Sequence, residues 1–393
     1  MEEQLRLDLR ALSVTRRILK FKPVRKLLPL LDAAAEARPV KDQVDAAGAY
    51  AAALLPYGLD PGSAILFFLE TDRNPYVDAR LNGTDDPLAA EMLAQELHIL
   101  GRAAAIGPDY VAASLPAYHG YLPAWRTSET DIPASYLAYL DAAPREGFGL
   151  YRNHSVFTLK HQSVVPVEHP DPVSLRDLHG YEWQRGILMR NTELLLGGGT
   201  ASNALLYGDS GTGKSTTIKA LANDLAPRGL RLIEVKKSQI QQIPSLTDRL
   251  AAEPLKFILF IDDLSFTEED DGFSSLKAIL EGSVQSRSAN VVMYATSNRR
   301  RLIKETFSDR DGDDIHANET VQQKTALSDR FGITLPYMNP KKDVYLQIVR
   351  KLAGALPIPE EDLLAGAERY ALEKGGRSGR VARQYVDQLA LAR

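Results

Sequence analysis

The segment GDSGTGKS, residues 208–215, has the residue types and spacing of a phosphate-binding loop. It matches G-x-x-x-x-G-K-[ST] in full, follows an apolar run and opens a helical pattern. Glycines let the backbone curl so that its N–H groups point at phosphate oxygens, and the next helix adds its positive dipole end. We expect Lys214 to reach the β- and γ-phosphates of a nucleoside triphosphate and Ser215 to ligate Mg²⁺. The predicted nucleotide-binding residues of this segment are Gly208, Asp209, Ser210, Gly211, Thr212, Gly213, Lys214, Ser215 and Thr216.

Two adjacent acids, Asp262 and Asp263, end the apolar run FILFIDD. Proteins with a phosphate-binding loop use a carboxylate after a second strand to ligate Mg²⁺, which we assign to Asp262. Asp263 stands where a general base could polarise the attacking water. Adjacent acids at a strand end can also be simply solvated, and this alternative is stronger for Asp263 than for Asp262.

Strands alternate with helices from residue 173 onward and would position these groups. Five mainly apolar runs predict strands at 203–208, 230–235, 256–263, 290–298 and 332–337. Most are nearly continuous in apolar residues, as in parallel strands covered by helices on both faces. Helical patterns follow at 341–356, 359–375 and 378–393. We therefore predict an α/β fold with a five-stranded parallel sheet between helices.

The first 150 residues are mainly helical by pattern and contain no catalytic constellation. Asp86 and Pro87 predict a capped helix start. The segment from Arg6 to Lys26 has eight basic residues and one acid, which suits a solvated helix face or a docking or nucleic-acid surface. Leucines at helical spacing are Leu5, Leu9, Leu12, Leu93, Leu97 and Leu100.

The composition of the 393-residue chain fits a protein of two or three domains. Apolar residues make up 44% and charged residues 25%, and the net charge of -4 gives no global drive toward nucleic acid or membranes. The lack of cysteine excludes disulfides and Cys-ligated zinc and favours a cytoplasmic location. The acidic start of the chain does not resemble a signal peptide, and no apolar run is long enough to predict a membrane span.

Three further motifs follow in the order found in AAA+ ATPases, which residues 173–393 resemble. ATSNRRR contains Asn298, which is similar to the first sensor that orients the hydrolytic water. LSDRFGI contains Arg330 and is similar to the arginine-finger segment of Holliday-junction motors and replication initiators. GRSGRVARQY contains Arg380, which looks like the second sensor on a helical lid.

The resemblance implies that Arg330 acts on the ATP of an adjacent subunit. An arginine supplied in trans stabilises charge on the transferring phosphoryl group, by roughly 10³- to 10⁵-fold in rate in other NTPases. The protein would then form a ring or an open homo-oligomer. The implied catalytic residues are Asp263, Asn298 and Arg330, and the implied cofactors are ATP and Mg²⁺.

The residues before the phosphate-binding loop, SLRDLHGYEWQRGILMRNTELLLGG, together with FIDDLSF, TSNRR and LSDRFG, resemble more closely a bacterial AAA+ family of unassigned function. The resemblance implies adenine contacts from Leu178, His179 and Gly180. Two departures from AAA+ proteins in general stand out. Asp263 replaces the usual glutamate, which suggests slow hydrolysis, and KKSQIQQIPSL lacks the aromatic–glycine loop of protein-threading members.

Sequence patterns predict a helical N-terminal domain (1–150) and a linker with a short strand (151–172). The resemblance implies an AAA+ core (173–340) and a helical lid (341–393). The acidic segment 302–326 suits a mobile interface loop better than a calcium site, because Asp309, Asp311, Asp313 and Asp314 lack EF-hand spacing. Two functions remain open: an ATPase that remodels or loads a protein or nucleic-acid partner, and a low-turnover ATP switch or adaptor. A small-molecule kinase fits less well, since it has no use for Asn298 and Arg330.

Overall fold

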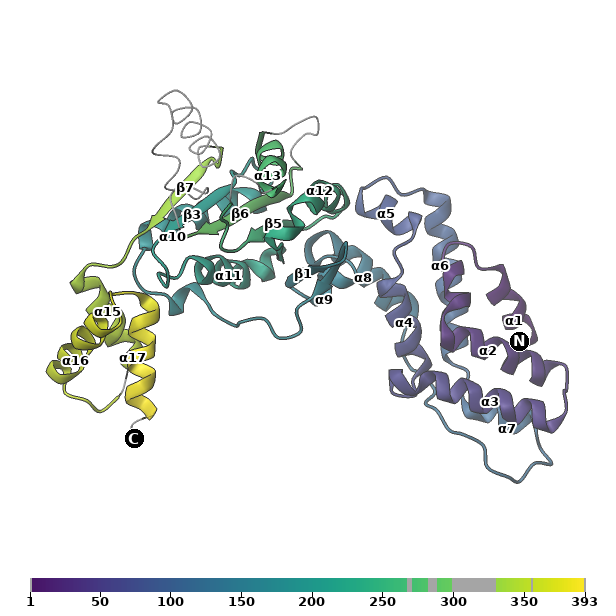
Figure 1. Cartoon of the computed structure of the whole chain (residues 1–393). Helices are drawn as coiled ribbons and strands as arrows, with labels where there is room; N and C mark the ends of the chain where they lie inside the picture. Colours follow the sequence, from purple (N-terminus) through teal and green to yellow (C-terminus); the bar gives the residue numbers. More distant parts are fainter. Residues whose placement is uncertain (1, 267–270, 282–287, 299–329, 355, 392–393) are drawn as a thin grey trace. The chain divides into compact units, whose positions relative to one another are not determined.

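The computed structural model of the chain describes residues 2–266, 271–281, 288–298, 330–354 and 356–391. The described residues divide into two compact units, Met1–Asn153 and His154–Arg393, called unit 1 and unit 2 below. Figure 1 shows unit 1 as helices and unit 2 as a sheet with helices around it, followed by a small helical group.

Unit 1 is built from helices that bury one face each in a common core. The leucines predicted at helical spacing are confirmed as core residues, with Leu9, Leu97 and Leu100 fully buried. The predicted cap at Asp86 is confirmed too, because its carboxylate accepts from the Leu88 N–H at 2.7 Å. The elements are α1 (Glu2–Ala11), η1 (Arg16–Lys20), α2 (Lys22–Ala35), α3 (Val40–Leu54), η2 (Leu55–Tyr57), α4 (Pro61–Thr71), α5 (Pro75–Leu81), α6 (Pro87–Ala104), α7 (Pro108–Ser114), α8 (Ile132–Glu146) and α9 (Leu150–Asn153).

A buried carboxylate joins the first turns of unit 1 to helix α6. Glu96 is 6% exposed and accepts hydrogen bonds from the backbone N–H groups of Ser13, Val14 and Thr15 and from two hydroxyls. Burial raises the pKa of Glu96, but these hydrogen bonds outweigh burial and leave the pKa below its ordinary value. The ionised carboxylate therefore fixes the link between α1 and η1.

The sheet of unit 2 has seven strands in the order β2-β1-β4-β5-β6-β3-β7. The five predicted strands form a continuous parallel block, β4-β5-β6-β3-β7. The short strand expected before residue 172 is β1, which pairs in parallel with β4 and forms an antiparallel hairpin with β2. The bounds are β1 (Val156–Lys160), β2 (Ser163–Pro166), β3 (Ala204–Gly208), β4 (Leu230–Glu234), β5 (Lys256–Ile261), β6 (Val291–Ser297) and β7 (Ile333–Tyr337).

Helices cover both faces of this sheet. Successive strand residues point to opposite faces, and the residues on both faces are buried. Leu206 and Phe260 share one core with helices α10 and α11, while Leu205 and Leu259 are buried on the opposite side, where α12 contacts β6. The helical elements around the sheet are η3 (Leu175–Asp177), α10 (Glu182–Leu196), α11 (Lys214–Leu225), η4 (Ala226–Arg228), η5 (Lys237–Gln242), α12 (Ile243–Ala251) and α13 (Asp271–Glu281).

The end of unit 2 is a three-helix group with its own core of Tyr345, Val349, Ala367 and Ala382. Its helices are α15 (Lys342–Ala353), α16 (Glu360–Glu373) and α17 (Gly379–Leu391). The first residues of α17 reach back to the sheet, since the Arg380 N–H donates to the Gly211 carbonyl at 3.1 Å. This contact places Arg380, the predicted second sensor, beside the phosphate-binding loop.

No single helix in the described part of the chain is long and apolar enough to cross a membrane. The bent pair Val40–Tyr57 and Pro61–Thr71 passes by length and composition alone, and its residues Tyr50, Leu54 and Ile65 belong to the core of unit 1.

Candidate nucleotide-binding site

The loop between β3 and α11 needs its glycines for physical reasons. Gly208, Gly211 and Gly213 have φ values of 133°, 76° and 93°, in the region that favours glycine. A Cβ at Gly208 would lie 2.3 Å from the carbonyl oxygen of Tyr337 on the neighbouring strand. The parallel pairing of β3 with β7 therefore requires glycine where the loop begins.

Lys214 begins helix α11 and is only 7% exposed. Its ammonium donates to the carbonyls of Gly208 (2.9 Å) and Asp209 (2.7 Å) and to Asn298 Oδ1 (3.0 Å). Burial lowers the pKa of Lys214, and the nearby charges of Asp209, Asp263 and Asp262 oppose that shift. The lysine is thus held at the centre of the loop by oxygen acceptors alone.

The two acids after β5 lie beside this loop in different environments. Asp262 Oδ1 accepts from the hydroxyls of Ser215 and Thr296, each at 2.5 Å. Asp263 has a left-handed backbone, with φ of 50°, and its Oδ1 accepts from Asn298 Nδ2 at 2.9 Å. The structure therefore brings the predicted Mg²⁺ ligands together and links Lys214, Asn298 and Asp263 in one chain of hydrogen bonds.

Thr296 belongs to this site but was missed in the sequence. Its side chain is buried, and besides donating to Asp262 it accepts from the Asp263 N–H at 2.9 Å. The backbone of Thr296 also accepts from the Leu264 N–H at 2.7 Å. Thr296 lies in β6 two residues before Asn298, which follows the strand. The alternation of side chains along a strand was therefore the available signal for Thr296.

An open cleft of about 1290 Å³ runs from the acids across the loop to the lid. Leu178 and His179 line it as expected, whereas Gly180 is not among its lining residues and lies against Val344 of α15. Burial lowers the pKa of His179, and the charges of Lys351 and Arg185 add to this effect. Seven of the nine predicted loop residues line the cleft: Ser210, Gly211, Thr212, Gly213, Lys214, Ser215 and Thr216.

Gly208 and Asp209 are not among the described residues that line the cleft. The Asp209 carboxylate accepts from the Asn339 N–H at 2.6 Å, and the Asp209 N–H donates to the Tyr337 carbonyl. Asp209 therefore fixes the loop to the end of β7 and to the segment that leads from β7 to the lid.

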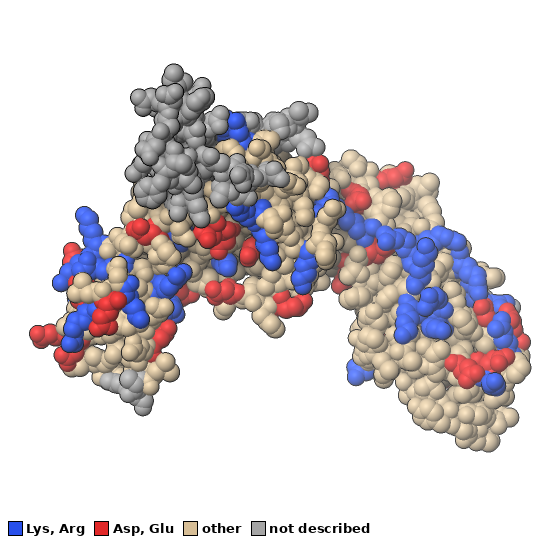
Figure 2. Space-filling view, in the orientation of Figure 1, with Lys and Arg blue, Asp and Glu red and all other residues tan. Residues whose placement is uncertain are grey.

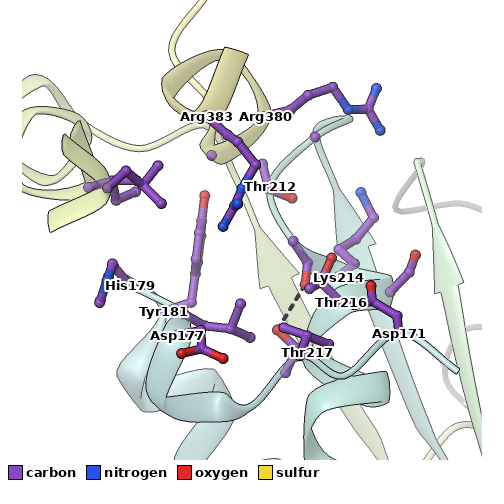
Figure 3. Close-up of a pocket in the computed structure, with 18 of the residues that line it drawn as sticks. Asp171, Asp177, His179, Tyr181, Thr212, Lys214, Thr216, Thr217, Arg380 and Arg383 are labelled. Atoms are coloured by element: carbon purple, nitrogen blue, oxygen red, sulfur yellow. Dashed lines mark hydrogen bonds between the residues drawn. The ribbon is translucent and has the colours of Figure 1, made fainter. Parts of the chain in front are cut away.

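Tyr181 and Arg383 also line the cleft and were missed by the sequence reasoning. Gly180 and Tyr181 have consecutive left-handed backbones (φ of 77° and 58°), which sets the Tyr181 ring on Tyr337 with centroids 4.7 Å apart. The Tyr181 hydroxyl donates to the Met338 carbonyl at 2.6 Å. Figure 3 shows Arg383 descending from the lid toward Tyr181. Arg380 lines the same cleft.

Arg330 lies at the end of the parallel strands that is opposite to this cleft. It precedes β7, whose first residue pairs with Ala204 and whose last pairs with Gly208, at the start of the phosphate-binding loop. A five-residue strand spans about 16 Å. Arg330 is consequently not among the described residues that line the cleft.

The acidic segment 302–326, with its calcium alternative at Asp309, Asp311, Asp313 and Asp314, lies outside the described residues. Within the described ranges, no group of three or more His, Asp or Glu side chains could hold a metal ion. A two-ligand site such as Ser215 and Asp262 is a different case, because substrate phosphates and water complete the usual Mg²⁺ shell.

Comparison with solved structures gives similarity to the RuvB Holliday junction branch migration motor of Thermotoga maritima. The identity is 16% and the TM-score 0.37, over 55% of this chain and 64% of that chain, which is less than two thirds of the motor. Two substituted variants of the same motor, 16% and 17% identical over the same shares, have TM-scores of 0.38. None of the curated proteins compared matches the sequence.

A family model described as "Protein of unknown function (DUF815)" matches residues 152–392. The match begins where unit 1 ends and includes the phosphate-binding loop, the two acids and the lid. It confirms the resemblance to a family of unassigned function, and the parallel block β4-β5-β6-β3-β7 with its helical lid agrees with the expected AAA+ core. Because the model matches more than half of the chain, the protein belongs to the DUF815 family.

Proposed function

We propose that the chain is an ATPase that hydrolyses ATP with Mg²⁺ at a subunit interface to remodel or load a protein or nucleic-acid partner. The observation that carries the proposal is the convergence of Ser215–Asp262 and Lys214–Asn298–Asp263 at one edge of the sheet. These are the side chains that phosphoryl transfer to water needs.

The donor set at Ser215 and Asp262 fits Mg²⁺, which prefers hydroxyl and carboxylate oxygens. Their oxygens are 2.5 Å apart, so one ion could take both as ligands after small side-chain shifts. Bound Mg²⁺ would neutralise charge that develops on the phosphate oxygens. Thr296, which shares the Asp262 oxygen, would keep the carboxylate oriented toward the ion.

Asp263 is the group we assign as general base. Its left-handed backbone turns it out of the strand direction, and Asn298 fixes its carboxylate on the side where Lys214 lies. In this role Asp263 would accept a proton from the attacking water while Asn298 orients both. Lys214 would stabilise negative charge on the terminal phosphate.

For the rest of the cleft, we assign base contacts to Leu178 and His179 and phosphate or ribose contacts to Arg380 and Arg383. Residues 173–340 would act as the nucleotide-binding core and 341–393 as a lid that senses the bound nucleotide. The contact between Arg380 and Gly211 supports this assignment, because lid movement would act directly on the phosphate-binding loop.

We further propose that Arg330 acts on the nucleotide of the adjacent subunit. Its position at the sheet edge opposite the cleft supports a role in trans, since its own cleft is about a strand length away. The guanidinium would stabilise the transferring phosphoryl group of the neighbour. Activity would then require a ring or an open homo-oligomer.

The alternative function is a low-turnover ATP switch or adaptor. The observation that favours it is Asp263 itself, whose side chain is one methylene shorter than glutamate and is already engaged by Asn298. Slow turnover would let ATP binding, rather than hydrolysis, set partner affinity.

ATP turnover and binding, measured on the same preparation, distinguish these functions. We expect wild-type protein to hydrolyse ATP in a Mg²⁺-dependent manner, and Asp263→Asn to bind ATP normally with turnover reduced at least about 100-fold, as for loss of a general base. Tight ATP retention with negligible wild-type turnover would favour the switch. Equal turnover by Asp263→Asn and wild type would remove Asp263 as the base.

A further inference from the structure

Unit 1 carries a dense group of cations on its surface. The segment Arg16–Lys26 contains six basic residues and no acid. Of these six residues, only Arg17 forms an ion pair with a described residue, Asp72, at 2.9 Å. The Arg17 side chain is still 66% exposed. Five of the six cations are exposed and Lys26 is half-buried: Arg16, Arg17, Lys20, Lys22, Arg25 and Lys26.

The fold fixes these charges in place, because apolar residues between them are buried. Ile18 anchors η1, while Val24 and Leu27 anchor the first turns of α2. Lys22, Arg25 and Lys26 share one face of α2 at spacings of three and four residues. Figure 2 shows basic side chains gathered on the visible face of unit 1. Like charges kept this close repel each other, so the arrangement favours an anionic partner.

Aromatic rings lie beside the cations. Phe21, between Lys20 and Lys22, contacts the Tyr57 ring with centroids 5.5 Å apart, and Tyr57 contacts Phe67 at 5.3 Å. The Phe67 side chain on α4 is 51% exposed although it is large and apolar. A continuous row of rings thus leads from the basic segment to an exposed aromatic face. We call these rings and the six cations the basic–aromatic surface.

We propose that the basic–aromatic surface binds single-stranded nucleic acid. Cations contact the phosphates, and an exposed ring offers a stacking face to an unpaired base, which is how sequence-tolerant single-strand binding works. A duplex hides its base faces and would use the cations alone. The proposal names the partner class and does not depend on ATP hydrolysis, because it concerns unit 1 only.

An anionic membrane would use the same charges, but the apolar residues argue against it. Membrane-surface helices lay an exposed apolar face into the lipid. In α2 that face consists of Val24, Leu27, Leu30 and Leu31, which are buried in the core of unit 1.

Fluorescence anisotropy of the full chain with a labelled 30-nucleotide single strand and with its duplex tests the proposal. Truncation is unsuitable, since Leu9 and Leu12 belong to the core. We expect the single strand to bind more tightly than the duplex. The double variant Lys20→Glu, Lys22→Glu should weaken single-strand binding at least 10-fold, and its log–log salt slope should be less steep by about 1.4, for two phosphate contacts.

Two more variants separate charge from stacking. The control Lys41→Glu, Arg145→Glu has the same change in net charge at exposed positions outside the surface, and it should bind like wild type. Phe67→Ala should weaken single-strand binding about 5- to 150-fold, as for the loss of one stacked base, and leave duplex binding unchanged.

Three results would overturn the proposal. The first is that wild type does not bind the single strand at 50 mM salt. The second is that the control variant loses as much single-strand affinity as Lys20→Glu, Lys22→Glu. The third is that Phe67→Ala keeps the single-strand affinity of wild type. Thermal melting must show that each variant is folded. If the charge-reversal variant Lys20→Glu, Lys22→Glu does not fold, the neutral variant Lys20→Gln, Lys22→Gln takes its place. Flotation with phosphatidylserine vesicles, in the absence of nucleic-acid binding, would assign the surface to membranes instead.

Discussion

Thr296→Val should disable the site without disturbing nucleotide binding. The substitution keeps the shape of the side chain but removes the hydroxyl that donates to Asp262 (2.5 Å) and accepts from the Asp263 N–H (2.9 Å). Asp262 then lacks one of the two hydroxyls that orient it. The Asp263 N–H retains only its 3.1 Å bond to the Asp262 carboxylate.

The expected magnitude follows from these two bonds. A hydrogen bond to a charged group contributes about 1.5–3 kcal/mol and a neutral one about 0.5–1.5 kcal/mol. Together the two bonds contribute about 2–4.5 kcal/mol. If this energy is lost in the transition state, kcat should fall about 30- to 2000-fold, since each 1.36 kcal/mol is tenfold in rate. The KM for ATP should change less than about threefold, because the phosphate-binding loop is intact.

Steady-state ATPase assays at a series of Mg²⁺ concentrations measure this effect. Thr296→Val should also need more Mg²⁺ for half-maximal activity, whereas Thr296→Ser keeps the hydroxyl and should stay within about threefold of wild type. Circular dichroism checks that all three proteins are folded. A Thr296→Val protein with wild-type kcat and Mg²⁺ dependence would refute the reasoning, and so would equal losses in the serine and valine variants.

Three further predictions concern single side chains. Lys214→Ala should abolish ATP binding in isothermal titration while the thermal midpoint stays within a few degrees, because the ammonium bonds to two loop carbonyls and to Asn298. Wild-type affinity would remove the phosphate-loop assignment. Asp262→Asn should raise the Mg²⁺ concentration needed for activity at least about tenfold, since a carboxylate ligand is lost; an unchanged Mg²⁺ titration would contradict its role. Glu96→Gln should destabilise unit 1 by about 1–3 kcal/mol in urea unfolding. The folded-state pKa of Glu96 is lowered, so wild type should lose this stability as the pH falls below 4.5, whereas the variant should not. If the free energies of unfolding of the two proteins change with pH in the same way, the ionised carboxylate of Glu96 does not stabilise unit 1.

The sequence predicted the fold of unit 2 well because its signals are local. The strand FILFIDD and the helix after GDSGTGKS are each determined by a short apolar or glycine-rich pattern, and the structure has both. The hairpin of β1 and β2 was only partly foreseen. Its pairing with β4 joins Val156 to Leu232, far away in the chain, and such pairing leaves no local signal.

The sequence predicted the site residues that belong to a motif and missed residues that only the fold brings to the cleft. Lys214, Asp262 and Asn298 come from motifs, and the structure brings them together. Tyr181 reaches the cleft only because of two consecutive left-handed residues, and Arg383 only because α17 returns to the loop. The conformation of Tyr181 leaves no periodic signal, whereas Arg383 follows Arg380 by three residues, so helical spacing could have indicated it.

Mixing two inactive variants tests the central claim, hydrolysis at a subunit interface, most directly. Lys214→Ala subunits lack the phosphate-binding lysine but supply Arg330, and Arg330→Ala subunits bind ATP but lack the arginine. After light scattering shows that both variants assemble and exchange subunits, ATPase activity is measured for each alone and for the mixture. We expect mixing to restore part of the wild-type activity, because an intact cleft meets an intact arginine across some interfaces. Mixed assemblies with no more activity than the separate variants would contradict the claim.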